Sequence, residues 1–220
     1  MHTTVKNLIN LETNIQSKIN NLNYTDYNPK IIAVSKTFKI DHINPLIEYG
    51  HKNFGENKVQ EAIEKWTEVK LKNSNVKLHM IGKLQSNKVK LAVKLFDYIH
   101  SLDNEKLAKK ISEEQKKINK NLKLFIQINI GSEDQKSGIN IKDIHDFNNY
   151  CKELNLDVIG TMCIPPDDNN QKSYFSQMQK INSELKYNEI SMGMSNDYLS
   201  ALEFKASFLR IGSSIFGSRN

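Results

Sequence analysis

The sequence predicts an α/β fold: a (β/α)8 TIM barrel with an extra N-terminal helix, forming one domain over residues 1–220. Short apolar runs rich in β-branched residues alternate along the chain with longer segments of helical periodicity. This alternation is typical of parallel strands joined by right-handed helical crossovers. Eight strand-like runs favour a closed barrel over an open doubly wound sheet, which more often has about five or six strands. No Pro-, Gly- or Ser-rich linker divides the chain.

The N-terminal half is expected to begin with a helix, because Val5, Leu8 and Ile15 recur at near-helical spacing. A buried strand, IIAVSK, follows a turn-rich break. In the next helix Asp41 is the expected cap and Gly50 the expected end. The strands expected in this half are 31–36, 51–55, 76–81 and 97–101, and the helices are 3–21, 41–49, 57–70 and 84–95.

The C-terminal half continues the same alternation. One strand is expected to stop before Pro165 and Pro166, which cannot continue a ladder. No full helix follows the last strand, so the N-terminal helix is expected to fill the gap that a missing eighth helix leaves. The strands expected here are 122–130, 156–163, 189–193 and 207–211, with helices 104–119, 141–154, 171–185 and 197–204 and a final turn at 213–216.

Composition restricts the possible functions. The chain has 220 residues, 38% hydrophobic and 25% charged, with a net charge of +6. The lysines are scattered among acidic residues without interleaved aromatics, which favours a solvated surface over a nucleic-acid site. No apolar run approaches a membrane span or a signal peptide. Cys151 and Cys163 lack metal-ligand spacing, so free thiols and a cytoplasmic location are expected, with no metal.

Lys36 is the first candidate functional residue. It directly follows a run of buried β-strand residues, and an ammonium group is costly to bury unless it is paired or deprotonated. A partly desolvated lysine at the rim of a barrel is suited to forming a Schiff base. The alternative is that Lys36 only extends to solvent at the end of its strand.

The last two strands predict a phosphate pocket. Loops after the seventh and eighth strands of such barrels commonly bind phosphate, assisted by the N-terminus of a short helix. Here Gly193 and Ser195 flank the first loop, and Gly212, Ser213 and Ser214 open the final turn. A Schiff-base lysine with a phosphate pocket indicates either a pyridoxal 5'-phosphate site or a sugar-phosphate aldolase.

Arg210 separates these two chemistries. Only two of the 31 basic residues are arginine, Arg210 and Arg219, so an arginine is expected where a permanently charged planar group is needed. Arg210 ends the eighth expected strand and is placed to face a pyridine nitrogen. It would keep that nitrogen unprotonated, which weakens the ring as an electron sink.

The chain resembles the pyridoxal phosphate homeostasis proteins, the YggS/PROSC family of PLP-binding proteins, along nearly its whole length. The resemblance rests on AVSKT (33–37), FGEN (54–57), HMIGKLQSNK (79–88), IHS (99–101), QINI (127–130), KSG (136–138), SMGMS (191–195) and RIGSSIFGSR (210–219).

The resemblance implies a single barrel similar to the N-terminal domain of alanine racemase, with PLP as cofactor. It implies that Lys36 forms a Schiff base with PLP, that Arg210 faces the pyridine nitrogen and that Asn57 lies near the cofactor. It also implies that Ser195, Gly212 and Ser213 hold the phosphate. Many family members have Thr where this chain has Ser213, and both side chains supply a hydroxyl.

The resemblance further implies a role in intracellular PLP homeostasis without catalytic turnover. The chain ends just after the phosphate loop, so no second domain supplying an opposing acid or base is expected. A PLP-dependent amino-acid racemase or lyase, and a Schiff-base aldolase, are the alternatives. Expected partners are PLP and PLP-dependent apo-enzymes, with no nucleic acid or membrane, and the expected state is a monomer. Whether Lys83 and Lys88 bind a second phosphate stays open.

Overall fold

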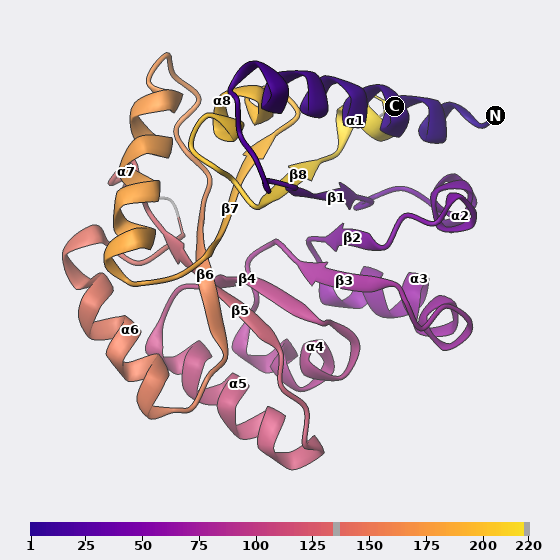
Figure 1. Ribbon diagram of the computed structural model, residues 1–220. Coiled ribbons are helices and arrows are strands. Elements are labelled where there is room, and N and C mark those ends of the chain that lie inside the picture. Colours follow the sequence, from indigo (N-terminus) through magenta and orange to yellow (C-terminus); the bar gives the residue numbers. More distant parts are fainter. Residues whose placement is uncertain (134–136, 218–220) are drawn as a thin grey trace.

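The computed structural model describes residues 1–133 and 137–217, so Lys136 of the KSG motif and Arg219 lie outside the described residues. Within the described chain, eight parallel strands close into a barrel in sequence order, and β1 pairs with both β2 and β8 (Figure 1). The predicted (β/α)8 barrel is confirmed. The strands are β1 (Lys30–Val34), β2 (Asn53–Glu56), β3 (Lys77–Met80), β4 (Tyr98–Leu102), β5 (Lys123–Ile128), β6 (Val158–Cys163), β7 (Glu189–Met194) and β8 (Phe208–Ile211).

Helices surround the strands as the alternating pattern predicts. Asn104 caps its helix, since its side chain accepts a hydrogen bond from the Leu107 N–H at 2.9 Å. The helices are α1 (Thr3–Asn21), α2 (Ile40–Tyr49), α3 (Val59–Lys72), α4 (Val89–Leu95), α5 (Glu105–Ile118), α6 (Ile144–Glu153), α7 (Gln171–Glu184), α8 (Tyr198–Leu202) and α9 (Ser213–Phe216), with 3-10 turns η1 (Ser86–Lys88) and η2 (Ile141–Asp143).

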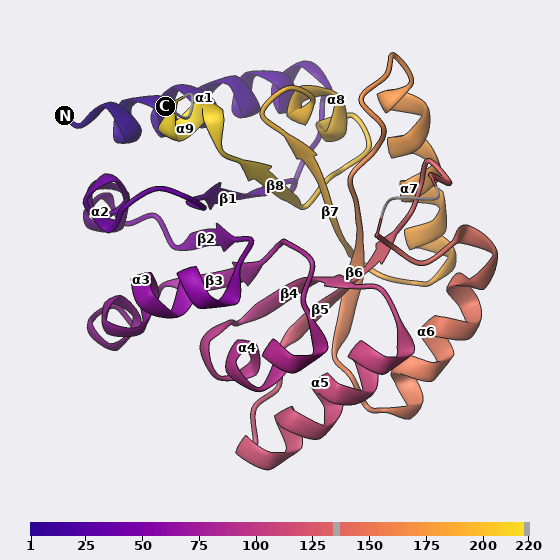
Figure 2. The same ribbon diagram turned by 180° about the vertical axis from the view of Figure 1, so that it is seen from behind.

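The N-terminal helix α1 occupies the position that a full helix after β8 would take, since within the described residues only the short α9 follows that strand. It contacts α2, α8 and α9, and Figure 2 shows it running alongside α9. Its buried face carries Val5, Leu8, Leu11, Ile15 and Ile19. Residues at this spacing share one side of a helix, so α1 covers β1 and β8 with an apolar stripe.

Several element ends differ from the sequence-based expectation, and two of the differences lie near the site. Strand β1 ends at Val34, so Lys36 lies two residues beyond the strand, in the loop that follows it. The capping residue of α2 is Lys39, whereas Asp41 lies within the first helical turn. Both differences are small shifts at element ends, where local propensity is least decisive.

The core has an outer and an inner layer. The outer layer lies between strands and helices and includes Trp66, which is fully buried with its ring 4.9 Å from that of Phe54. Inside the barrel, Ile32, Phe125, Met162 and Phe208 form a separate apolar cluster. Polar residues share that interior, and they carry the argument about function.

Candidate functional site

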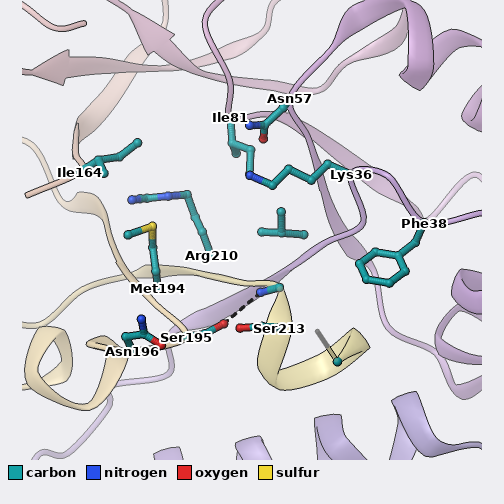
Figure 3. Close-up of a pocket in the computed structure, with 13 residues that line it drawn as sticks. Lys36, Phe38, Asn57, Ile81, Ile164, Met194, Ser195, Asn196, Arg210 and Ser213 are labelled. Carbon is teal, nitrogen blue, oxygen red and sulfur yellow. Dashed lines mark hydrogen bonds between the residues drawn. The ribbon is translucent and has the colours of Figure 1, made fainter. Parts of the chain in front are cut away.

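A cavity of about 470 Å³ opens where the carboxyl ends of the strands meet. This end of a barrel is where loops build active sites. Figure 3 shows Lys36 extending into the cavity from one side, and Ser195 and Ser213 lying on the α9 side. The structure brings all six predicted site residues to this one cavity: Lys36, Asn57, Ser195, Arg210, Gly212 and Ser213.

The backbone on both sides of Lys36 is anchored to α3. The hydroxyl of Ser35 donates to Glu56 Oε1 at 2.7 Å, and Lys65 Nζ donates to the Ser35 carbonyl at 2.8 Å. The Thr37 N–H donates to Glu61 Oε1 at 2.5 Å. Two hydrogen bonds therefore fix the backbone on either side of Lys36, and a third holds the side chain of Ser35, while the half-buried Lys36 side chain lines the cavity.

Glu56, Glu61 and Lys65 form the anchor, which we call the carboxylate clamp. Lys65 Nζ lies 2.9 Å from Glu56 Oε1 and 3.0 Å from Glu61 Oε1. Glu56 is fully buried, and its Oε1 also accepts from Trp66 Nε1 at 2.9 Å. Burial favours a raised pKa at Glu61, but the Thr37 N–H and Lys65 outweigh it, and the pKa is lowered.

Asn57 contributes a buried acceptor to the cavity. Its Oδ1 is buried and has no hydrogen-bond partner among the described residues. Gly82 permits this position, because a Cβ at residue 82 would lie 2.5 Å from the Asn57 carbonyl oxygen. The glycine of the HMIGKLQSNK motif is therefore a packing requirement of the site. A buried acceptor without a partner is costly, so this atom suits a hydrogen-bond donor on a ligand.

Backbone N–H groups converge at the start of α9. The N–H groups of Gly212 and Ser214 donate to Ser195 Oγ at 3.3 and 3.4 Å. Near the end of β7, just before Ser195, Gly193 has a φ of +90° and lies close to Ala201, and both features require glycine. The arrangement places Ser195, Gly212 and Ser213 around one group of donors suited to an anion.

Arg210 is fixed in the wall of the cavity with an exposed fraction of only 4%. Its Nη1 donates to Ser191 Oγ and its Nη2 to the Cys163 carbonyl, each at 2.8 Å. Burial lowers the pKa of Arg210, while Cys163 and Asp197 oppose that shift. The ordinary pKa of arginine is so high that the guanidinium stays charged. Two of its five N–H groups are used in these bonds, which leaves others to face a ligand.

The apolar lining of the cavity was not predicted. Phe38, Ile81, Ile164 and Met194 line it, and the Phe38 ring stacks on Phe216 at 4.8 Å. Each of the four follows a strand or ends one, and this position is the sequence signal that could have identified them. Apolar residues at strand ends are too common for that signal to single them out. Lys83 is exposed and lines a neighbouring cavity, while Lys88 lies in η1.

The cysteines are buried free thiols, as predicted. Burial raises the pKa of the Cys163 thiol to about 12, so this thiol is protonated near neutral pH. Among residues 1–133 and 137–217, no group of three or more His, Cys, Asp or Glu is arranged to hold a metal ion. The same part of the chain contains no helix with the length and apolar character needed to cross a membrane.

Comparison with known proteins identifies relatives of the whole chain. Residues 7–220 match the family described as "Alanine racemase, N-terminal domain". The pyridoxal phosphate homeostasis protein of Pasteurella multocida is 37% identical, with 99% of this chain and 98% of that protein covered. The protein of the same name from Vibrio cholerae is 34% identical, with 100% and 98% covered.

Solved structures agree with these relatives. PipY of Synechococcus elongatus without PLP has a TM-score of 0.81 and 31% identity, covering 92% of this chain and 100% of PipY. PipY with PLP bound has a TM-score of 0.77 at the same identity and coverage. Alanine racemase of Clostridium difficile has a TM-score of 0.68 at 17% identity, covering 93% of this chain and 56% of the racemase, and so shares the fold. The chain belongs to the family of pyridoxal phosphate homeostasis proteins.

Proposed function

We propose that this protein binds pyridoxal 5'-phosphate in a single barrel domain, residues 1–220, and takes part in intracellular PLP homeostasis. The observation that carries the proposal is the convergence of Lys36, Arg210 and the Ser195–Gly212 donors on one cavity. Its volume of about 470 Å³ lies within the range of small-molecule cofactor sites. The relatives named for PLP homeostasis and the PLP-bound PipY structure support the same ligand.

The polar groups of the cavity fit this cofactor. An aldehyde needs an amine, and Lys36 is the lysine that lines the cavity wall. A phosphate needs N–H and hydroxyl donors, which the N–H groups of Gly212 and Ser214 and the hydroxyls of Ser195 and Ser213 supply. The buried Oδ1 of Asn57 needs a donor, and Arg210 offers N–H groups to a ring nitrogen.

Each residue then has a role in holding the cofactor. Nζ of Lys36 would hold the aldehyde group of the cofactor as a Schiff base. Ser195, Gly212 and Ser213 bind the phosphate, and Asn57 accepts a hydrogen bond from the ligand. Arg210 faces the pyridine nitrogen with a group that does not release its proton. When bound, the cofactor supplies an electron-withdrawing ring, and Arg210 limits that property by leaving the nitrogen unprotonated.

Binding without turnover follows from this set of residues. Catalysis on a PLP adduct needs a strong electron sink and a positioned acid or base. Arg210 weakens the electron sink, because it leaves the ring nitrogen unprotonated. The relatives are named for homeostasis of the cofactor rather than for a reaction. We therefore assign the protein to holding PLP and delivering it to PLP-dependent apo-enzymes, as a cytoplasmic monomer without a nucleic-acid or membrane partner.

The decisive experiment is an absorbance spectrum of the purified protein with PLP, before and after borohydride, followed by mass analysis of the peptide containing Lys36. We expect a visible band that borohydride removes and a pyridoxyl adduct on Lys36. Lys36→Ala should abolish the adduct, and Lys39→Ala, an exposed lysine three residues away, should keep it. A wild-type protein that takes up no PLP, or an adduct that persists in Lys36→Ala, would contradict the proposal.

A further inference from the structure

A continuous chain of hydrogen bonds crosses the interior of the barrel and ends on Arg210. Asn53 Oδ1 lies 3.1 Å from His79 Nε2, and His79 Nδ1 lies 3.0 Å from His100 Nε2. His100 Nδ1 lies 2.8 Å from Ser191 Oγ, which accepts from Arg210 Nη1 at 2.8 Å. Five strands contribute one residue each: β2, β3, β4, β7 and β8. We call Asn53, His79, His100 and Ser191 the histidine chain.

The direction of donation is determined from the Asn53 end, and the Arg210 end is compatible with it. The carbonyl oxygen of Asn53 only accepts, so His79 Nε2 carries a hydrogen and, in a neutral ring, His79 Nδ1 accepts. His100 Nε2 then donates to it, and His100 Nδ1 accepts from the Ser191 hydroxyl. From the other end, a guanidinium only donates, so Ser191 Oγ must accept and its own hydrogen is available for His100. The Asn53 end therefore requires the Nε2–H tautomer in both imidazoles, and the Arg210 end is compatible with it.

Packing holds the two rings in the planes that these bonds need. His79 stacks on Tyr98 with ring centroids 4.2 Å apart, and His100 stacks on Phe125 at 4.3 Å. His79, His100 and Ser191 are all fully buried. Burial, followed by Lys30, lowers the pKa of His79 well below its ordinary value. Burial, followed by His79 and Arg210, does the same for the pKa of His100, so both rings are neutral.

We propose that Asn53, His79, His100 and Ser191 are positioning residues that hold the guanidinium of Arg210 in one orientation at the cofactor cavity. Each bond in the chain sets the donor or acceptor role of the next group, so that the lone pairs of Ser191 are presented to Arg210. Without an acceptor on His100, the Ser191 hydroxyl can turn, and the guanidinium loses its fixed partner. The expected effect on PLP binding rests on the proposed function. The expected tautomers of His79 and His100 do not depend on it.

The chain holds protons rather than moving them. Its far end is the amide of Asn53, which does not titrate and cannot take up a proton at neutral pH. Its near end is an arginine, which does not release one. The function of the chain is therefore orientation. This distinguishes it from a histidine pair that serves as a general base or a proton shuttle.

The first test is the tautomer of each histidine, read by long-range ¹H–¹⁵N NMR of the protein without PLP. We expect Nε2–H at both His79 and His100 in the wild type. His79→Phe keeps an aromatic ring against Tyr98 but removes the acceptor for His100. We expect a population of the Nδ1–H tautomer at His100 in that variant. His145→Gln changes an exposed histidine and should leave both signals unchanged. A charged ring or an Nδ1–H tautomer at His100 in the wild type overturns the proposal.

The second test compares PLP affinity and the absorbance maximum of the bound cofactor. We expect Ser191→Ala to weaken PLP binding about tenfold, the usual effect of losing a hydrogen bond to a charged group, and to shift the maximum. Ser191→Thr keeps the hydroxyl and should restore both. His79→Phe should weaken binding roughly threefold, since it acts two bonds further away. Wild-type affinity and spectrum in Ser191→Ala would overturn the proposal, whereas a wild type that binds no PLP contradicts the proposed function instead.

Discussion

The two sides of the cavity are held in different ways. Lys36 is anchored from outside the barrel by the carboxylate clamp, which contacts the backbone of its neighbours Ser35 and Thr37 and also the Ser35 hydroxyl. Arg210 is anchored from inside the barrel by the histidine chain, which contacts its side chain. The clamp contains three charged groups, whereas the histidine chain contains neutral groups alone.

The difference follows from burial and from what each residue has to do. The clamp lies between the strands and α3. Glu61 is half-buried there, and Lys65 is shared between the two carboxylates. The barrel interior already contains the charge of Arg210, and a second ion there would be costly unless it were paired. Fixing the backbone of Lys36 leaves the amine to react, whereas Arg210 acts through the direction of its N–H groups and needs a fixed side chain.

The largest effect should come from breaking the clamp. Glu56→Leu removes the carboxylate that accepts from Ser35, Lys65 and Trp66, and it leaves the buried Lys65 with a single carboxylate of the clamp, the partly exposed Glu61. We expect the free energy of unfolding to fall by about 3–5 kcal/mol, the typical result of removing one partner of a buried ion pair. Denaturant unfolding monitored by Trp66 fluorescence measures this change.

A double replacement separates the buried charge from the lost packing. Glu56→Leu combined with Lys65→Met removes both ions, so the double variant should be more stable than Glu56→Leu alone. Glu61→Gln keeps the size of the third clamp residue and should have a much smaller effect, since Glu61 is partly exposed. A double variant less stable than Glu56→Leu would show that the clamp is not held by charge balance.

Acid should weaken the two sides in different pH ranges. The pKa values of His79 and His100 are well below 6.5 in the folded state. Below about pH 6.5 the unfolded chain binds protons that the folded chain does not, so stability falls as the pH drops from there. The lowered pKa of Glu61 acts in the same direction, but only below the ordinary carboxylate pKa of about 4.3.

The histidine contribution can be isolated by its slope. Each neutral buried histidine contributes up to about 1.4 kcal/mol per pH unit below 6.5, so two give roughly twice that. Replacing both His79 and His100 with Phe should flatten the dependence of unfolding free energy on pH between about 6.5 and 5. The comparison is of slopes, so a change in absolute stability does not affect it. An equal slope in wild type and variant would contradict the neutral state of the rings.

A smaller effect is expected at Gly82, which sets the position of Asn57 on the Lys36 side. Gly82→Ala places a methyl group 2.5 Å from the Asn57 carbonyl oxygen, so the backbone has to move. We expect a loss of about 1–3 kcal/mol in stability, and weaker PLP binding, because Asn57 lines the cavity. Gly50→Ala is a matched control at a helix end, where the cost is conformational and no atom lies within 4 Å. Its PLP affinity should match the wild type.

The sequence predicts the barrel and six residues that line the cavity, but not the contacts that hold Lys36 and Arg210 in place. The alternation of short apolar runs with longer helical segments was sufficient to predict the eight strands. Lys36 and Arg210 stand out because a charged residue at the end of an apolar strand is unusual. Helix ends were shifted by one residue at α2 and by as many as five at α4, which begins at Val89 after a 3-10 turn, because several neighbouring residues can cap or begin a helix.

The histidine chain needed the closed barrel to be recognised. His79 and His100 lie in short strand segments whose sequence gives no sign that the two rings meet. Both are fully buried inside the barrel. Contact between His100 and Ser191 joins residues 91 positions apart across the barrel. Alternation shows that a side chain points inward, but not which inward residue of another strand it meets.

The smallest effect is expected at Thr37, next to Lys36. Thr37 has a φ of +69°, a left-handed conformation that β-branched residues rarely adopt, and it is exposed. Thr37→Asn should stabilise the protein by roughly 0.5 kcal/mol, because asparagine tolerates this conformation better and the N–H to Glu61 is kept. Thr37→Val keeps the β-branch and should bring no gain. If Thr37→Asn stabilises the fold but weakens PLP binding, the strained backbone at Thr37 helps to set the position of Lys36. If stability and PLP affinity rise together, the clamp alone sets that position.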